Sequence, residues 1–178
     1  PEVFEQVHKQ TGLQIMEGFG QTESVLMLGN LVGSTAKIGS LGKPTPLYNI
    51  MIADNEGNRL PANEVGEIVV IPSENQHGIF MGYCGNEDLY ANVWKYGIYH
   101  TGDTAYMDDD GYYWYVGRID DLIKTRGYRV GPFEIENVLM EHPAVMECAV
   151  TGIPDKARGQ AIKATIHLAK GFDKSKEL

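Results

Sequence analysis

GRIDDLIKTRGYRVGPFEIE, residues 117–136, is the stretch that decides the fold. It places Arg118 and Arg129 around an acidic pair and a glycine turn at Gly127, and Pro132 then suits the first position of a helix. A glycine turn lets the chain bend, and guanidinium groups bind anions. The stretch therefore predicts a flexible joint that lies beside an anionic ligand.

The residues after this joint predict a small sheet with a helix packed on it. Pro132 starts the helix, and Pro143 prevents its continuation. Residues 145–150 predict a strand. Residues 162–168 alternate between apolar and polar side chains, which is the period of a half-buried strand. The expected order of elements is β, α, β, β.

The residues before the joint predict a short helix followed by a β-rich module. The helix ends at Gly12, and the β-rich part begins at about residue 36. DNEG at 54–57 and DDDG at 108–111 are turn signals for antiparallel hairpins, and the latter lacks the ligand spacing of a calcium loop. The clearest strands are 49–53, 67–71 and 112–116. The fold class is therefore α+β, with a β-barrel-like part followed by a small α+β part.

Composition excludes several classes of protein. A net charge of −9 and an isoelectric point near 5.0 argue against a nucleic-acid-binding protein, which would need dense Lys and Arg. No apolar run is long enough to span a membrane. Cys84 and Cys148 lack the spacing of metal ligands, so we expect reduced thiols in a soluble, cytoplasmic protein.

GFGQTES, residues 18–24, is the first candidate binding motif. Its glycines would let the backbone approach a flat ligand, and Phe19 could stack on a base. Thr22 offers a donor to phosphate, and Glu23 offers a carboxylate to Mg²⁺. The alternative is an ordinary strand-to-loop turn, which the segment taken alone favours.

HTGD, residues 100–103, is the second candidate motif. The carboxylate of Asp103 could accept two hydrogen bonds from the cis-diol of a ribose. The alternative is an aspartate that closes a turn, which a lone TGD favours. A hairpin between Asp103 and Arg118 would return the chain to the same end of the sheet.

Together these three stretches resemble the adenylate-forming superfamily, which includes acyl-CoA synthetases, aryl-CoA ligases, luciferases and the adenylation domains of peptide synthetases. The pattern GRxDDxIKxxGxRVxxxEIE is too long for chance agreement. Flanking segments such as GKPTP and GNRLPANEVGEI resemble the short- and medium-chain acyl-CoA synthetases. The resemblance implies that residues 1–118 end a large AMP-binding domain and that residues 119–178 hold the hinge and the start of a small C-terminal domain.

The resemblance also implies residue roles. Phe19, where the family usually has Tyr, would stack on adenine, and Asp120 would be the hinge. Glu23 would ligate Mg²⁺, and the turn at Arg126 and Gly127 would border the pantetheine tunnel of CoA, where a side chain would obstruct a narrow channel. The implied catalytic residues are Thr22 at the α-phosphate, Glu23, and Arg129 at phosphate oxygens. The implied nucleotide-binding residues are Gly18, Phe19, Gly20, Gln21, Thr22, Asp103, Arg118 and Arg129.

The implied reaction has two steps. A small-molecule carboxylic acid attacks the α-phosphate of MgATP to give an acyl-adenylate and pyrophosphate, the small domain rotates, and the thiol of CoA then attacks the acyl carbon and displaces AMP. Residues 24–28 could contribute to the acyl pocket. We expect the phosphate loop before Pro1 and the catalytic lysine after Leu178, so the chain alone should be inactive. The alternatives are an adenylation domain that loads a carrier protein and a nucleotide-binding relative without catalysis.

Overall fold

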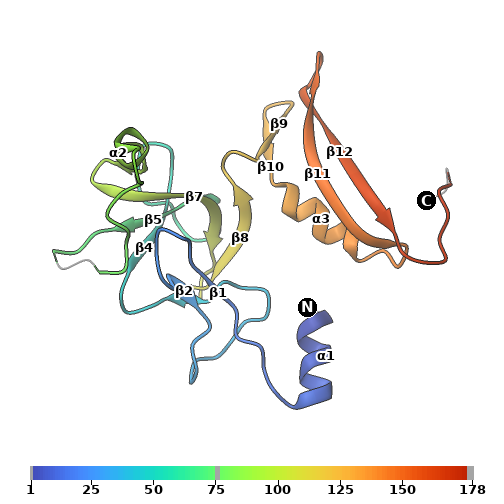
Figure 1. The fold of residues 1–178 in the computed structure, drawn as a ribbon, viewed down its shortest axis with the longest axis horizontal. Helices are drawn as coiled ribbons and strands as arrows, with labels where there is room; N and C mark the ends of the chain where they lie inside the picture. Colours follow the sequence, from blue (N-terminus) through green and yellow to red (C-terminus); the bar gives the residue numbers. More distant parts are fainter. Residues whose placement is uncertain (1, 75–76, 176–178) are drawn as a thin grey trace. The chain divides into compact units, whose positions relative to one another are not determined.

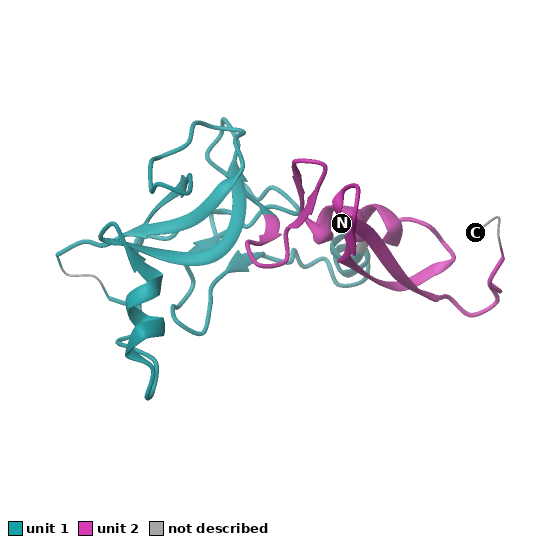
Figure 2. Ribbon diagram, turned by 90° about the horizontal axis from the view of Figure 1, so that it is seen from above, with its two compact units in different colours: residues 1–115 teal, residues 116–178 magenta. Residues whose placement is uncertain are grey.

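The computed structural model describes residues 2–74 and 77–175, which form two compact units. Unit 1 covers residues 1–115, and unit 2 covers residues 116–178 (Figure 2). The division falls after Tyr115, slightly earlier than the boundary at Arg118 expected from the sequence. Both units combine helices with antiparallel strands, which confirms the α+β class.

Unit 1 holds two helices and two sheets (Figure 1). The helices are α1 (Glu2–Thr11) and α2 (Glu87–Val93). The smaller sheet contains β1 (Gly18–Phe19), β2 (Leu28–Gly29) and β3 (Lys43–Pro44). The larger sheet has the order β4 (Asn49–Ala53), β5 (Gly66–Ile71), β7 (Ile98–Met107) and β6 (Trp94–Lys95), and β8 (Tyr113–Arg118) also pairs with β7. A bridge between Gly42 and Tyr113 connects the two sheets, which gives the unit its barrel-like character.

The strands β4 and β5 are buried on both faces, which is why their sequences are nearly continuous apolar runs. On one face Ile50 and Val70 are paired in a cluster that also contains Tyr99. On the other face Met51 and Val69 are paired and pack with Ile98. The strands expected at 49–53 and 67–71 are confirmed.

Unit 2 contains one helix and a four-stranded sheet. The helix is α3 (Pro132–Met140), and the strand order is β10 (Tyr128–Val130), β9 (Ile123–Thr125), β12 (Gly159–Leu168) and β11 (Val145–Asp155). Gly131 caps α3, and the helix ends before Pro143 as expected. β11 extends beyond the expected strand at 145–150 because it pairs along nearly the whole of β12.

The half-buried face expected for residues 162–168 is not found within the described part of the chain. Ile162 and Ile166 are 43% and 39% exposed. The helix packs on β11 instead: a carboxylate oxygen of Glu136 accepts a hydrogen bond from the N–H of Val150 at 2.7 Å, and Val150 is buried. Val150 is therefore buried against α3, whereas Ile123 is buried on β9.

The turn between β7 and β8 is an aspartate turn, as the DDDG signal predicts. Asp108 Oδ1 accepts hydrogen bonds from the N–H groups of Asp110 and Tyr112, and Gly111 has a φ of 81°. These local bonds occupy the carboxylate in the manner of an Asx turn. The turn therefore closes the β7–β8 hairpin through local hydrogen bonds.

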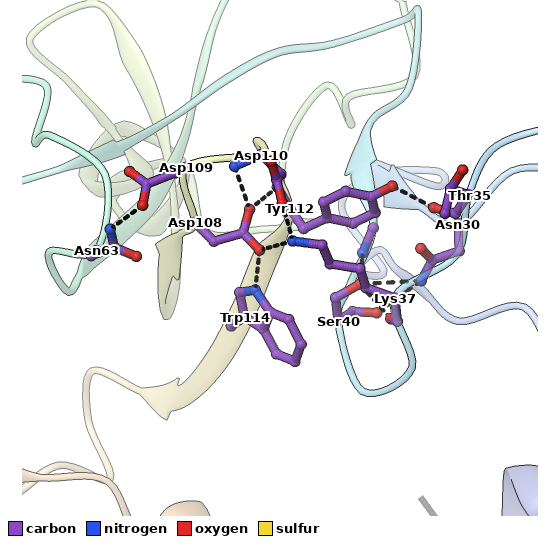
Figure 3. A network of polar contacts seen from close by, with 11 residues as sticks. Asn30, Thr35, Lys37, Ser40, Asn63, Asp108, Asp109, Asp110, Tyr112 and Trp114 are labelled. Carbon is purple, nitrogen blue, oxygen red and sulfur yellow. Dashed lines mark hydrogen bonds and ion pairs between the residues drawn. The ribbon is translucent and has the colours of Figure 1, made fainter.

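Lys37 ties a distant loop to this turn (Figure 3). Its Nζ lies 2.7 Å from Asp108 Oδ2 and 2.7 Å from Asp110 Oδ2, and these contacts raise the pKa of the lysine. Partial burial alone would raise the pKa of Asp108, but hydrogen bonds from Lys37, the Tyr112 N–H and the Trp114 indole lower it to about 2. The loop before β3 is thus held on the β7–β8 hairpin by charge.

Candidate functional site

The first motif forms a tight turn at the end of β1. The N–H of Ser24 donates to the carbonyl of Gln21 at 3.1 Å, and Ser24 Oγ accepts from the N–H of Gln21 at 3.1 Å. A Cβ at Gly20 would lie 2.8 Å from the carbonyl oxygen of Val25, and one at Gly18 would lie 2.6 Å from Leu26. Gly20 is therefore needed for close approach of the returning backbone, a packing reason that the sequence did not reveal, whereas the atom nearest to a Cβ at Gly18 is the end of a flexible side chain.

Three side chains of the motif have different surroundings. Phe19 is half-buried against the core of unit 1, and Thr22 is exposed in the turn. Glu23 is half-buried, and its Oε1 accepts a hydrogen bond from the hydroxyl of Tyr83 at 2.7 Å. Sequence analysis missed Tyr83, because no local pattern indicates that a tyrosine so far along the chain meets Glu23.

The second motif is a bulge inside β7. Glu67 pairs with Thr104 and Val69 pairs with His100, so Ile68 alone faces the three residues 101–103. The alternative of an aspartate that closes a turn is therefore wrong, since Asp103 lies within a strand. The bulge lifts this stretch out of the regular ladder, and side chains replace the lost pairing.

Two side chains stabilise the bulge. Thr101 Oγ1 donates to the carbonyl of Ile68 at 2.7 Å. Gly102 adopts a φ of 74°, and its N–H donates to Glu67 Oε1 at 2.8 Å. The other oxygen of Glu67 lies 2.7 Å from Nδ1 of His100. The residues of HTGD other than the aspartate thus hold the backbone that presents Asp103.

Asp103 is buried and bound by both carboxylate oxygens. It is 5% exposed. Its Oδ2 accepts from Nε2 of Gln21, and its Oδ1 accepts from the hydroxyl of Tyr115 at 3.0 Å. The two motifs, which lie far apart in the sequence, therefore meet in one site of unit 1.

In unit 2, Arg118 and Asp120 lie at the end of β8. Arg118 Nη2 is 3.5 Å from Asp120 Oδ2, and the two side chains are 40% and 72% exposed. Asp120 lies in the turn that links β8 to β9. An exposed pair of this kind contributes little to stability, so Asp120 is not fixed by a strong contact to its neighbour.

The β9–β10 hairpin explains Gly127. Thr125 pairs with Tyr128, so Arg126 and Gly127 form a two-residue loop, and their φ values are 49° and 85°. Positive φ at both positions is typical of a type I′ turn, which demands glycine or a tolerant residue. A Cβ at Gly127 would contact nothing within 4 Å, so within unit 2 conformation, not space, explains this glycine.

The strained Arg126 is supported by a residue that sequence analysis missed. Its N–H donates to the carbonyl of Arg158 at 2.9 Å, in the loop between β11 and β12. Arg129 is exposed on β10, directly across from Lys124. Four cationic residues, Lys124, Arg126, Arg129 and Arg158, therefore gather on the β9–β10 hairpin and the adjacent loop.

Comparison with known proteins identifies the family of this chain. The AMP-binding enzyme family profile matches residues 1–84, and the profile of the AMP-binding enzyme C-terminal domain matches residues 134–178. The chain belongs to the adenylate-forming superfamily. The residues of the second motif and the β9–β10 hairpin lie between the two matched ranges of this adenylate-forming chain.

Similar proteins extend across these middle residues. The mitochondrial acyl-coenzyme A synthetase ACSM3 of Rattus norvegicus is 48% identical over 169 residues, which cover 94% of this chain and 29% of the relative. The 4-hydroxybutyrate–CoA ligase 1 of Metallosphaera sedula is 48% identical over 179 residues, which cover 100% of this chain and 32% of the relative. The crystal structure of the anthranilate CoA ligase AuaEII with anthranoyl-AMP superimposes with a TM-score of 0.84 at 36% identity and covers 98% of this chain and 33% of that one. The adenylate-forming chain thus spans about a third of the length of these relatives.

The described residues contain neither a membrane-spanning helix nor a cluster of metal-ligating side chains. None of the helices that the structure describes is long and apolar enough to cross a bilayer. Among residues 2–74 and 77–175, no group of three or more His, Cys, Asp or Glu side chains could hold a metal ion.

Proposed function

We propose that residues 1–178 are part of an AMP-forming acyl-CoA synthetase. Such an enzyme activates a carboxylic acid as its acyl-adenylate and transfers the acyl group to CoA. The observation that carries the proposal is the buried carboxylate of Asp103, which is bound by Gln21 of the first motif. The names of the similar CoA ligases favour CoA as the acceptor.

Nucleotide binding follows from the chemistry of three side chains. A carboxylate accepts hydrogen bonds from two neighbouring hydroxyl groups, so Asp103 would bind the ribose of ATP. The ring of Phe19 would stack on adenine, because base and aromatic ring attract through their faces. Arg118 would bind the ribose from the joint between the domains. Together these contacts would fix the α-phosphate for attack by the substrate carboxylate.

Thr22 and Glu23 would act at the phosphates. Thr22 is exposed in its turn, where its hydroxyl can donate to an α-phosphate oxygen. Glu23 fits a Mg²⁺ site because Tyr83 holds one of its carboxylate oxygens, and Mg²⁺ bound to a nucleotide needs only one or two protein carboxylates. When bound, the ion would neutralise negative charge that develops at the phosphates. Arg129 would supply a further positive charge from unit 2.

The second half-reaction would use the joint and the β9–β10 hairpin. Asp120, in an exposed turn, would be the hinge about which the small domain rotates. The backbone at Arg126 and Gly127 would then border the pantetheine of CoA. The cationic side chains on this hairpin, together with Arg158, would bind the phosphates of CoA. A chain with a net negative charge needs local positive charge to bind such an anion.

We also propose that the enzyme is cytoplasmic. Both cysteines are free, and neither has a disulfide partner among the described residues. The ACSM3 relative is named as mitochondrial. Imaging of the tagged full-length protein would separate the two locations, and a mitochondrial signal would contradict the proposal.

The activity is tested with the full-length enzyme and a panel of acids from acetate to octanoate and benzoate. We expect carboxylate-dependent exchange of pyrophosphate into ATP, followed on addition of CoA by AMP release and an acyl-CoA of the expected mass. Acylation of a carrier protein without any acyl-CoA would favour the carrier-loading alternative. No exchange with any acid would favour a nucleotide-binding relative without catalysis.

A further inference from the structure

The side chain of Gln21 makes three hydrogen bonds, two of which link the two motifs. The inference drawn from them rests on the proposed function. The side-chain Nε2 donates to the carbonyl of Thr101 at 2.9 Å and to Asp103 Oδ2. The Oε1 accepts from the hydroxyl of Tyr99 at 3.0 Å. Because a carbonyl oxygen only accepts, Thr101 fixes which end of the amide points at Asp103.

The backbone of Gln21 is fixed as well. Its N–H and its carbonyl are both bound to Ser24 within the motif turn. Tyr99 is 1% exposed, so the far end of the amide is buried in the core of unit 1. Gln21 is therefore a rigid link between the turn of the first motif and the bulge of the second.

Asp103 is bound at two different oxygens, which determines the plane of its carboxylate. Gln21 binds Oδ2 and Tyr115 binds Oδ1, so rotation of the carboxylate about its last bond would break both hydrogen bonds. A cis-diol needs both oxygens of the carboxylate in one plane at the same time. A rotated carboxylate would present only one of them to the ribose.

We infer that Gln21 and Tyr115 are positioning residues that hold Asp103 for two-point recognition of a ribose, and so set the preference for ATP over 2′-deoxyATP. Neither residue needs to touch the nucleotide for this effect. Loss of either bond removes one of the restraints on the carboxylate plane, which weakens the contact to a pair of hydroxyls more than the contact to a single one. Discrimination between the two nucleotides should therefore fall together with affinity.

Gln21→Glu gives a test with a distinctive pH dependence. The substitution places a second carboxylate against Asp103 with little change of shape. Two carboxylates that share a site hold one proton between them at low pH and repel each other once both are ionised. A protonated Glu has one donor where the Gln amide has two, so the carbonyl of Thr101 competes with Asp103 for it even in acid, and the bond to Asp103 is lost altogether as the pH rises.

Other titratable groups surround this site, so the wild-type profile must be measured over the same range. They are Tyr99 and Tyr115 at the carboxylate and amide, Glu67 and His100 on the bulge, and Glu23 in the motif turn. All of them are present in both proteins. Only the difference between the two profiles reports on the introduced carboxylate.

The measurement is carboxylate-dependent exchange of pyrophosphate into ATP or 2′-deoxyATP by the full-length enzyme, from about pH 5.5 to about pH 8.5. For Gln21→Glu we expect a KM for ATP above that of wild type at the acid end, rising by on the order of tenfold or more toward the alkaline end relative to the wild-type profile. The kcat should change by less than about threefold, since the ribose contact is remote from the reacting phosphate. The ratio of kcat/KM for ATP over 2′-deoxyATP should fall by a factor similar to the rise in KM.

The control variant is Gln14→Glu, which adds the same charge at an exposed position outside the site. It should match wild type throughout. A Gln21→Glu enzyme whose KM and nucleotide preference follow the wild-type profile would overturn the inference, as would a loss confined to kcat.

If Gln21→Glu does not fold, Tyr115→Phe tests whether Asp103 is held in position by its two hydrogen bonds. This variant removes one hydroxyl, and we expect the KM for ATP to rise about three- to tenfold, the range for one lost hydrogen bond, with a reduced preference for ATP. An unchanged preference refutes the inference. If the wild-type enzyme shows no exchange with any acid, the proposed function fails, and dissociation constants of ATP and 2′-deoxyATP for the same variants, measured by calorimetry, then decide the inference alone.

Discussion

Replacing Asp103 by Asn tests the ribose contact with little change of shape. In the native site both oxygens of Asp103 accept hydrogen bonds, from Gln21 and from Tyr115. An Asn can still accept from Gln21 through its oxygen, and its NH₂ can donate to the hydroxyl of Tyr115, since a hydroxyl also accepts. The substitution should therefore fold while it removes the negative charge and one acceptor.

The expected loss follows from the two contacts to the ribose. One hydroxyl loses a charged acceptor altogether, which costs about 1.5–3 kcal/mol, and the other keeps a neutral acceptor in place of a charged one, which costs about 0.5–1 kcal/mol. The sum of about 2–4 kcal/mol corresponds to a rise in the Kd for ATP of roughly 30- to 1000-fold.

The assay is isothermal titration calorimetry of ATP binding to the full-length enzyme, supported by the KM for ATP in pyrophosphate exchange. The control is Asp109→Asn, which removes an exposed carboxylate that accepts a hydrogen bond from Nδ2 of Asn63. A Kd for Asp103→Asn within about threefold of wild type, in a protein with an unchanged melting temperature, would refute the ribose assignment.

Three further predictions concern the joint, the cation site and the charged turn. Asp120→Pro should leave pyrophosphate exchange within about threefold and slow acyl-CoA formation by at least about tenfold, because a rigid φ hinders rotation; equal loss in both half-reactions would contradict the hinge. Tyr83→Phe should raise the Mg²⁺ concentration needed for half-maximal exchange by about three- to tenfold, since Glu23 loses the bond that orients it, and an unchanged Mg²⁺ dependence would refute that role. Asp108 has its pKa lowered to about 2, so its stabilising contribution is present above the ordinary carboxyl pKa of 3.8 and is lost as the pH falls toward 2. Lys37→Met should lower the melting temperature at neutral pH and should make the melting temperature fall less on acidification. Melting temperatures of wild type and variant that change in parallel with pH would contradict this role of Asp108 and Lys37.

Elements with strong local patterns could be predicted from the sequence. The strands at 49–53 and 67–71 are apolar because both of their faces are buried. The helix that starts at Pro132 and stops before Pro143 is fixed by the chemistry of proline. The DDDG turn at 108–111 is determined by bonds within a few residues. In each case the cause is local, so the pattern is visible in the sequence.

The arrangement inside the site could not be predicted. The bulge at 101–103 depends on Glu67 in another strand. The orientation of Asp103 depends on Gln21, and that of Glu23 depends on Tyr83. Such pairings are set by tertiary packing and leave no periodic or turn signal.

For two glycine positions, the surrounding residues in the structure give a physical reason that the sequence alone did not indicate. Gly20 of the first motif makes room for the chain at Val25. Gly127 is needed for its backbone angle, and no narrow space surrounds it within unit 2. The physical reason for a glycine thus required the coordinates of its neighbours.

The most direct test of the account is a crystal structure of the full-length enzyme with bound AMP. The account predicts that both carboxylate oxygens of Asp103 lie within hydrogen-bond distance of the two ribose hydroxyls, that adenine lies against the ring of Phe19, and that Arg118 reaches the same ribose. A nucleotide bound elsewhere, or these three side chains facing separate regions of the molecule, would contradict it.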